Sequence, residues 1–206
     1  MGNSSSKVNQ FGQPIFQFDV AEFQFKMTTL DSYLNFQIEN ARFEGLASLE
    51  GKLLNDMRSP QRNQQSELIL ANSILHQYNR IQLLQSASQS CFQLLSNAQY
   101  IELLGVDFNK VPTEILLSLE RLLYIVKHEQ GTTLGQFGYG LRHQFVKLFG
   151  AKLLEHLEKF SRLAAKENLT SYETLEYPKE EVKNFLLTFA KEKGIGQNNS
   201  MGGYPG

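Results

Sequence analysis

The sequence has no tryptophan, a single cysteine and only five prolines in 206 residues. One cysteine excludes an internal disulfide, and the place of Cys91 inside an apolar helical stripe predicts a small buried side chain. The 20 basic and 21 acidic side chains nearly cancel, so no overall field attracts nucleic acid, and we expect no nucleic-acid partner. No apolar run approaches the roughly 18 residues of a membrane-spanning helix, and no secretory signal follows Met1, so we expect a cytoplasmic protein.

Motifs of catalysis and metal binding are also missing. There is no nucleophile elbow, Walker loop, HExxH or CxxC pair, and the acidic side chains are spread along the chain. His76 has no second ligand four residues later, and His143 and His156 are thirteen residues apart, so no metal site is expected. The glycine-rich segment 131–140 lacks the ending of a phosphate loop and is interpreted as a hinge or loop. We predict a non-enzymatic protein with no catalytic residue and no non-covalent cofactor; a helical enzyme of unfamiliar type is the alternative.

What the sequence does contain is helical periodicity, beginning with a long first arm over residues 20–57. Its apolar residues recur at steps of three and four at Phe23, Met27, Leu30, Leu34, Ile38 and Ala41. The stripe resumes at Leu46, and we interpret the change as the drift of a 3.6-residue period over many turns. Ser59-Pro60 ends the arm, because a residue before proline avoids helical geometry.

A second arm of similar pattern is expected from about Ser66, as its N-cap, to Leu104. A link as short as residues 59–65 makes the two arms antiparallel neighbours. Three shorter helices should follow, at about 113–129, at about 141–166 with a basic face, and after Pro178. The last has one apolar stripe that must dock, formed by Val182, Phe185, Leu186 and Phe189. The predicted fold is therefore all-α, a long antiparallel helical hairpin with three shorter helices packed on it.

The chain begins with MGNSSSK, which fits the N-myristoylation pattern, with Gly2 as acceptor once Met1 is removed. The alternative is a disordered polar start. One myristoyl chain anchors only marginally, so a second membrane contribution is needed. Lys7, Phe11 and Phe16 are the membrane-proximal candidates, although this apolar stretch could instead cover the start of the hairpin. We expect a lipidated flexible segment at 1–18, a helical domain at 19–195 and a flexible tail at 196–206.

This order of elements resembles the ESCRT-III superfamily, and its increased-sodium-tolerance (Ist-like) branch in particular. The strongest local likeness is HQFVKLFGAKLLEHL at 143–157, followed by TLEYPKEEVKNFLLTFAKEKGI at 174–195. The lipidation signal resembles that of the myristoylated vacuolar-sorting subunit. The resemblance implies a hairpin core with a fifth helix folded back on it, and assembly with itself or related subunits. No leucine-rich tail motif follows residue 195, so recruitment of an AAA ATPase is not among the expectations.

From this resemblance we expect a peripheral scaffold on endosomal or other intracellular membranes, acting in membrane remodelling, multivesicular-body formation and protein transport. In this hypothesis the stripe from Val182 to Phe189 closes the hairpin, and its release exposes apolar surface to the next subunit. A second hypothesis is a monomeric myristoylated helical adaptor that presents a partner-binding surface. A crescent-shaped curvature-sensing dimer usually has a basic concave face, and the first arm has acidic residues in excess.

Overall fold

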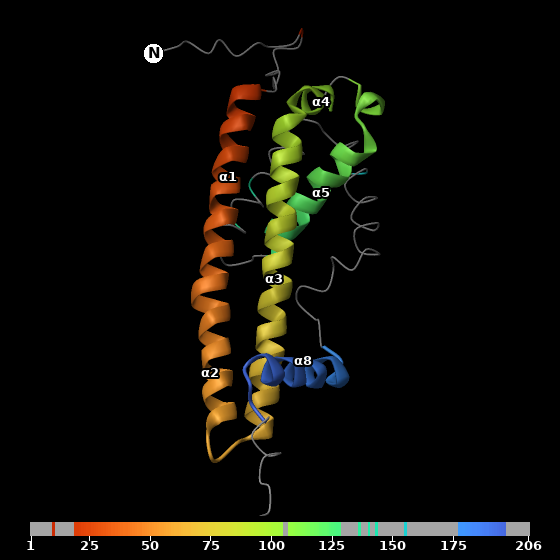
Figure 1. Ribbon diagram of the computed structural model, residues 1–206. Coiled ribbons are helices and arrows are strands. Elements are labelled where there is room, and N and C mark those ends of the chain that lie inside the picture. Colours follow the sequence, from red (N-terminus) through yellow and green to blue (C-terminus); the bar gives the residue numbers. More distant parts are fainter. Residues whose placement is uncertain are drawn as a thin grey trace, which may run out of the picture. The chain divides into compact units, whose positions relative to one another are not determined.

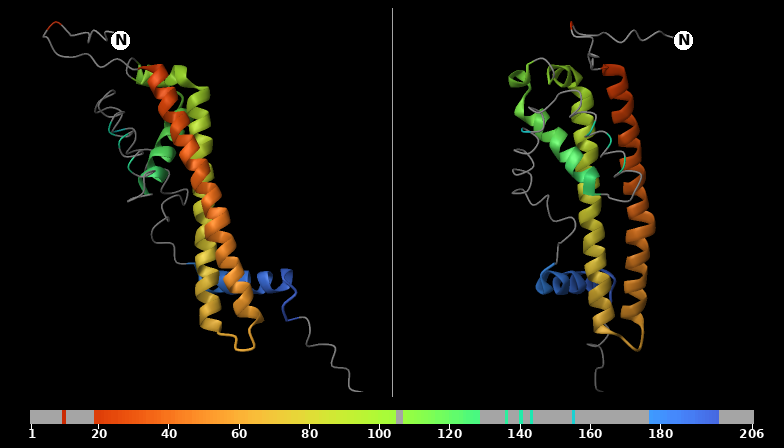
Figure 2. Two further views of the ribbon diagram at one scale, coloured as in Figure 1. Left: turned by 90° about the vertical axis from the view of Figure 1, so that its left-hand side faces the viewer. Right: turned by 180° about the vertical axis from the view of Figure 1, so that it is seen from behind.

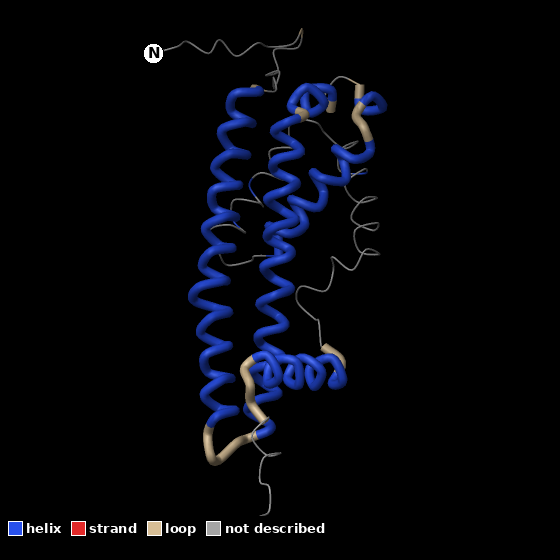
Figure 3. Tube along the Cα trace, in the orientation of Figure 1, coloured by secondary structure: helices blue, strands red, loops and turns tan. Residues whose placement is uncertain are grey.

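The computed structural model describes residues 10, 19–104, 107–128, 136, 140, 143, 155 and 177–196. Regular structure in these residues is helical, with no strand among them (Figure 3). The all-α class predicted from the sequence is therefore confirmed. The chain divides into two compact units, Met1–Leu34 with Ser86–Thr170, and Asn35–Gln85 with Ser171–Gly206. The fourth expected helix, at 141–166, lies outside the described ranges apart from isolated residues.

The first arm consists of three consecutive elements, α1 (Val20–Asn40), the π-helical turn η1 (Ala41–Leu46) and α2 (Ala47–Arg58). Asp19 caps the start of α1, because its carboxylate accepts the N–H of Glu22 at 3.1 Å. At the other end the backbone of Ser59 turns extended, with ψ at 138°, as expected before a proline.

The π-helical turn corrects our interpretation of the apolar stripe as gradually drifting. In η1 the N–H of Ala47 donates to the carbonyl of Arg42, five residues back instead of four. The sequence shows the same irregularity, since the step from Ala41 to Leu46 is five residues where an α-helical stripe steps by three or four. One wider turn absorbs the extra residue, so the apolar face of α2 points inward again, with Leu53 fully buried.

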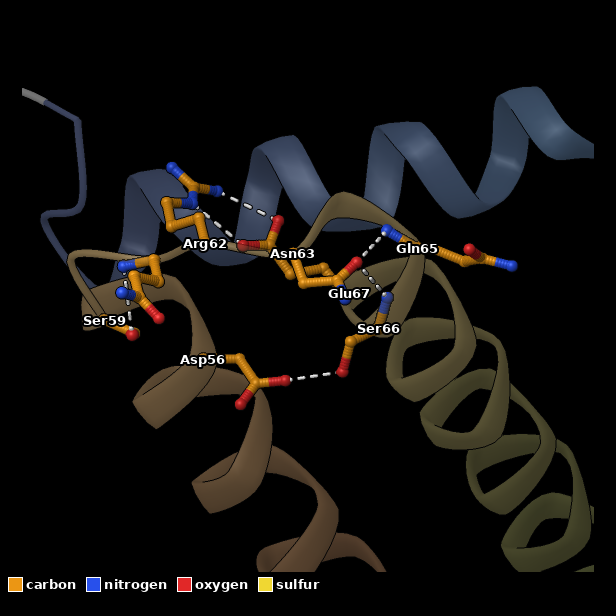
Figure 4. A network of polar contacts seen from close by, with 8 residues as sticks. Asp56, Ser59, Arg62, Asn63, Gln65, Ser66 and Glu67 are labelled. Carbon is orange, nitrogen blue, oxygen red and sulfur yellow. Dashed lines mark hydrogen bonds and ion pairs between the residues drawn. The ribbon is translucent and has the colours of Figure 1, made fainter.

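The turn between the arms is fixed by side chains (Figure 4). The side-chain oxygen of Asn63 accepts the N–H groups of Gln65 and Ser66, at 3.0 and 3.3 Å, so Asn63 caps α3 (Gln64–Ser96). Our prediction of Ser66 as the cap was wrong: its hydroxyl instead donates to Asp56 at the end of α2, at 2.7 Å.

A bidentate ion pair completes this turn. Arg62 donates from Nε and Nη2 to the two carboxylate oxygens of Glu67, at 2.8 and 3.0 Å. The Glu67 side chain is buried, whereas the Arg62 side chain is about half exposed. The hydrogen bond to Glu67 raises the pKa of Arg62, because it favours the charged guanidinium. The two arms are thus held at a defined turn.

The second arm is also interrupted. α3 ends at Ser96, and α4 (Ala98–Leu103) begins after Asn97, whose backbone leaves helical geometry at φ −127° and ψ 35°. One uninterrupted helix to Leu104, as we had expected, is therefore wrong. The side-chain amide of Asn97 donates to the Gln93 carbonyl at 2.8 Å, where a continuing helix would have placed a backbone donor.

In the first unit, α1 and the C-terminal part of α3 are joined by a hydrogen bond from Ser88 to the Asp31 carboxylate, 2.6 Å long. The helical turn η2 (Phe108–Lys110) leads to α5 (Thr113–His128), in good agreement with the predicted third helix. α5 lies beside this part of α3 (Figure 1). The fully buried side chains of these helices include Met27, Leu30, Leu34, Leu94, Leu119, Leu122 and Leu123.

In the second unit, α2 and the N-terminal part of α3 lie side by side, and α8 (Lys179–Glu192) crosses them (Figures 1 and 2). The arms are linked by Tyr78, whose hydroxyl donates to Glu50 at 2.8 Å, and by Arg80, which donates to Gln37 at 3.3 Å. The core contains Leu53 of α2 and Phe189 of α8. The final helix therefore has an apolar site to occupy.

Candidate functional site

The stripe of α8 that the sequence singled out is packed against α2 and α3. Val182 and Phe189 are buried, with Phe189 5% exposed, while Phe185 and Leu186 are partly buried. Phe189 shares a core cluster with side chains of both arms, Leu53, Met57 and Ile74. Further apolar side chains surround this cluster, namely Leu46, Leu49, Leu54, Leu70, Ala190 and Ile195. Three of the four predicted residues, Phe185, Leu186 and Phe189, thus belong to one contact surface, and the fourth, Val182, is also buried.

Aromatic contacts define how α8 lies on the arms. Phe185 and Phe189 stack with ring centroids 5.9 Å apart, and the rings of Tyr78 and Phe185 form a T-shaped pair with centroids 6.4 Å apart. Burial, followed by the hydrogen bond to Glu50, raises the pKa of Tyr78 to about 12. Its hydroxyl is therefore neutral at physiological pH and donates to Glu50 while its ring supports α8. One side chain thus joins all three helices of this site.

The N-terminal end of α8 is held by Tyr177, which the sequence analysis did not single out. Its hydroxyl donates to the backbone carbonyl of Leu75 on α3 at 2.9 Å. Its ring meets His76 edge-on at 5.0 Å, and burial, with a smaller contribution from Glu181, raises its pKa. The partner of Tyr177 lies about a hundred residues away in the sequence, so no local sequence pattern indicates this hydrogen bond.

The C-terminal end of α8 is closed by a Schellman motif. The N–H of Ile195 donates to the Ala190 carbonyl at 2.8 Å, and that of Gly194 to the Lys191 carbonyl at 3.2 Å. Gly194 has a φ of 68°, which a side chain would disfavour, so a glycine at this position allows the helix to end here. Ile195 packs on the core cluster. Both ends of the helix are therefore fixed to the same unit.

The membrane-proximal predictions lie elsewhere in the chain. Gly2, Lys7, Phe11 and Phe16 are outside the described residues, so the myristoylation and membrane hypotheses stay predictions. In the described part of the chain, no helix is both long and apolar enough to cross a bilayer.

Metal-binding side chains do not gather in the described ranges. These ranges contain no group of three or more His, Cys, Asp or Glu side chains that could hold a metal ion. Cys91 is fully buried, and burial, followed by the charge of Asp31, raises the pKa of its thiol. A protonated, inaccessible thiol is not a nucleophile.

Comparison with known proteins adds no relative. No family model, no curated protein and no solved structure matches the chain.

Proposed function

We propose that this chain is a non-enzymatic peripheral membrane scaffold of the ESCRT-III type, with Ist-like character. Gly2 would hold a myristoyl chain, and the two arms would form a long hairpin on which three shorter helices pack. The protein would assemble with itself or with related subunits in membrane remodelling and endosomal protein sorting. The observation that supports this proposal is the docking of α8 across α2 and α3.

Docking of α8 provides the element that such a scaffold needs for controlled assembly. The stripe of α8 packs on the cluster of Leu53, Met57 and Ile74, which would lose the cover that α8 gives if α8 left. Burial stabilises by roughly 25 cal/mol per Å² of apolar surface, so a few such side chains contribute several kcal/mol. That is enough to bias a two-state equilibrium between a closed subunit and an open one that presents the same apolar surface to a neighbour.

Assembly also supplies the second membrane contribution that the lipid requires. A single myristoyl chain binds a bilayer with an association constant of only about 10⁴ M⁻¹. Each added subunit brings another chain to the same polymer, and linked anchors act at high effective concentration. Membrane binding and polymerisation would therefore reinforce each other.

The closing role of α8 is tested with Phe185→Asp/Phe189→Asp, which places two charges in the core cluster. We expect this variant to lose only the helical circular dichroism of the 14 residues of α8 and to form larger assemblies in sedimentation velocity. Leu187→Asp is the matched control, because Leu187 lies on the same helix but is 70% exposed. Tyr177→Phe opens the site more gently, by removing only the hydrogen bond to Leu75. If the charged variant stays monomeric, or only unfolds while Tyr177→Phe changes nothing, the closing role is refuted.

The membrane role is tested by co-sedimentation of the myristoylated protein with vesicles, beside a Gly2→Ala form, and negative-stain microscopy of the pellets. Filaments or coated tubules with the lipidated form alone support the scaffold. Lipid-dependent pelleting without ordered polymer supports the second candidate, a monomeric myristoylated adaptor. The adaptor is favoured by the same docking of α8, since a closed subunit has its apolar site covered. If neither form pellets, both membrane functions are refuted.

A further inference from the structure

Two phenylalanines of the second unit lie on the surface of the first arm. Phe36 on α1 is 60% exposed and Phe43 in η1 is 72% exposed, whereas Ile38 and Ala41 between them are buried. Glu39 and Arg42 are also exposed and form an ion pair at 3.2 Å. We call Phe36, Glu39, Arg42 and Phe43 the phenylalanine face. It takes no part in the packing of α8, so the proposed function does not explain it.

The charge of this face selects among its potential occupants. One acidic and one basic side chain leave it without net charge, so neither a strongly acidic nor a strongly basic partner gains from it. An anionic lipid surface gains nothing from an uncharged face either. A second copy of the same face, by contrast, offers an acid for each base and a base for each acid.

The spacing of the face is also suited to self-pairing. A two-fold interface is self-complementary: if one residue of the first copy contacts another residue of the second copy, the same contact occurs with the two copies exchanged. About an axis between positions 39 and 40, an antiparallel second copy brings each Phe36 to the Phe43 of the other copy. The same rotation brings each Glu39 near the Arg42 of the other, which turns two ion pairs into a neutral group of four charges. We infer that the phenylalanine face pairs with the same face of a second copy of this chain.

The size of the face sets the strength of this pairing. At roughly 200 Å² for a whole phenylalanine side chain, the exposed parts of Phe36 and Phe43 amount to about 260 Å² in each copy. Two copies would bury about 500 Å² of it, well below the roughly 1,200–2,000 Å² of stable complexes. The pairing is therefore weak and reversible. It needs neither a lipid nor release of α8, so it goes beyond the proposed function and can hold or fail independently of it.

Sedimentation equilibrium of the unmyristoylated full chain provides the first test. We expect a monomer–dimer equilibrium, and at least a tenfold rise in its dissociation constant for Phe36→Ser/Phe43→Ser. Ile69→Ser is the matched control, because Ile69 is 61% exposed in the same unit but lies on α3. A wild-type chain that stays monomeric at millimolar concentration overturns the inference. Equal weakening by the control variant overturns it as well.

The charged pair gives a second test. Glu39→Arg places four positive charges at the contact and should weaken the dimer at least tenfold. Adding Arg42→Glu reverses both signs and should restore the wild-type constant, because the charges are again complementary within and between copies. Failure of the double reversal to restore association, with both variants folded by circular dichroism, overturns the predicted arrangement.

Crosslinking tests the two-fold axis directly. The natural thiol, Cys91, is fully buried, so a cysteine placed on the surface reports its own contacts. Asn40→Cys lies beside the axis and should crosslink to itself in a second copy, whereas Gln82→Cys, exposed on α3, should not. Equal crosslinking at both positions overturns the inference. A lipid surface is the alternative occupant of the phenylalanine face. The inference is overturned if the wild-type chain remains monomeric and Phe36→Ser/Phe43→Ser abolishes its binding to phosphatidylcholine–phosphatidylserine vesicles.

Discussion

Deleting Glu44 tests whether η1 exists to absorb one extra residue. The side chain of Glu44 is exposed, and without it the step from Ala41 to Leu46 becomes four residues, as a regular α-helix requires. The π turn should convert to an α turn, with α2 still presenting its buried stripe to the core. We therefore expect the free energy of unfolding to change by no more than about 1 kcal/mol.

The same deletion in a regular helix should be far more harmful. Removing the exposed Gln82 from α3 rotates one side of the helix by about 100° against the other. Buried residues before it, such as Ile74 and Ile81, then lose alignment with Leu84 after it. Each misplaced aliphatic side chain costs roughly 2–5 kcal/mol. The summed cost is therefore comparable to the whole free energy of unfolding of a typical protein, about 5–15 kcal/mol.

Urea unfolding followed by far-ultraviolet circular dichroism distinguishes the two deletions. The Glu44 deletion should keep a cooperative transition with a midpoint close to wild type, and the Gln82 deletion should have none or a much earlier one. The explanation of η1 as a register correction is refuted if the Glu44 deletion unfolds as readily as the Gln82 deletion.

Three further perturbations test the packing of the second unit. Phe189→Ala should lower the free energy of unfolding by about 3 kcal/mol in a urea titration, because it empties a buried site; Leu187→Ala should stay within about 0.5 kcal/mol, and equal effects would contradict the assigned packing. Arg62→Ala should cost roughly 1–3 kcal/mol by leaving the buried Glu67 carboxylate unpaired. Arg62→Met/Glu67→Met should recover most of this loss in a double-mutant cycle. The pKa of Tyr78 rises from an ordinary value near 10 to about 12 in the folded chain. The protonated Tyr78 hydroxyl therefore stabilises the folded state fully below pH 10, and this stabilisation disappears as the pH rises toward 12. In thermal melts, the melting temperature of Tyr78→Phe should therefore fall less steeply with pH in this alkaline range than that of the wild type. Equal slopes for the two proteins would contradict a stabilising role of the Tyr78 hydroxyl.

Features encoded within a few turns could be predicted from the sequence. The steps of three and four that mark Phe23, Met27 and Leu30 also describe the buried face of α1. Ser59-Pro60 ends α2, and Gly194 ends α8, because proline and glycine act on their own backbone. The five-residue step at η1 was visible too, but an irregular stripe alone does not distinguish gradual drift from a single wide turn.

Features that depend on distant partners could not be predicted. Ser66 and Asn63 are both good capping residues, and the choice between them depends on Asp56, which engages the serine hydroxyl. Tyr177 is a functional candidate only because the Leu75 carbonyl lies within its reach. The apolar stripe of α8 predicts that this face of the helix is buried. That it is buried on α2 and α3 depends on the tertiary packing, which the sequence pattern does not contain.

The fixed ends of α8 have a consequence for any process that detaches it. A helix of 14 residues is marginal in water by itself, and α8 contains β-branched and aromatic residues that weaken it further. When α8 detaches, the segment therefore unfolds, and it does not move away as a rigid helix. Whatever captures it must refold it, so opening and recapture should be sensitive to temperature and denaturant in the manner of local unfolding.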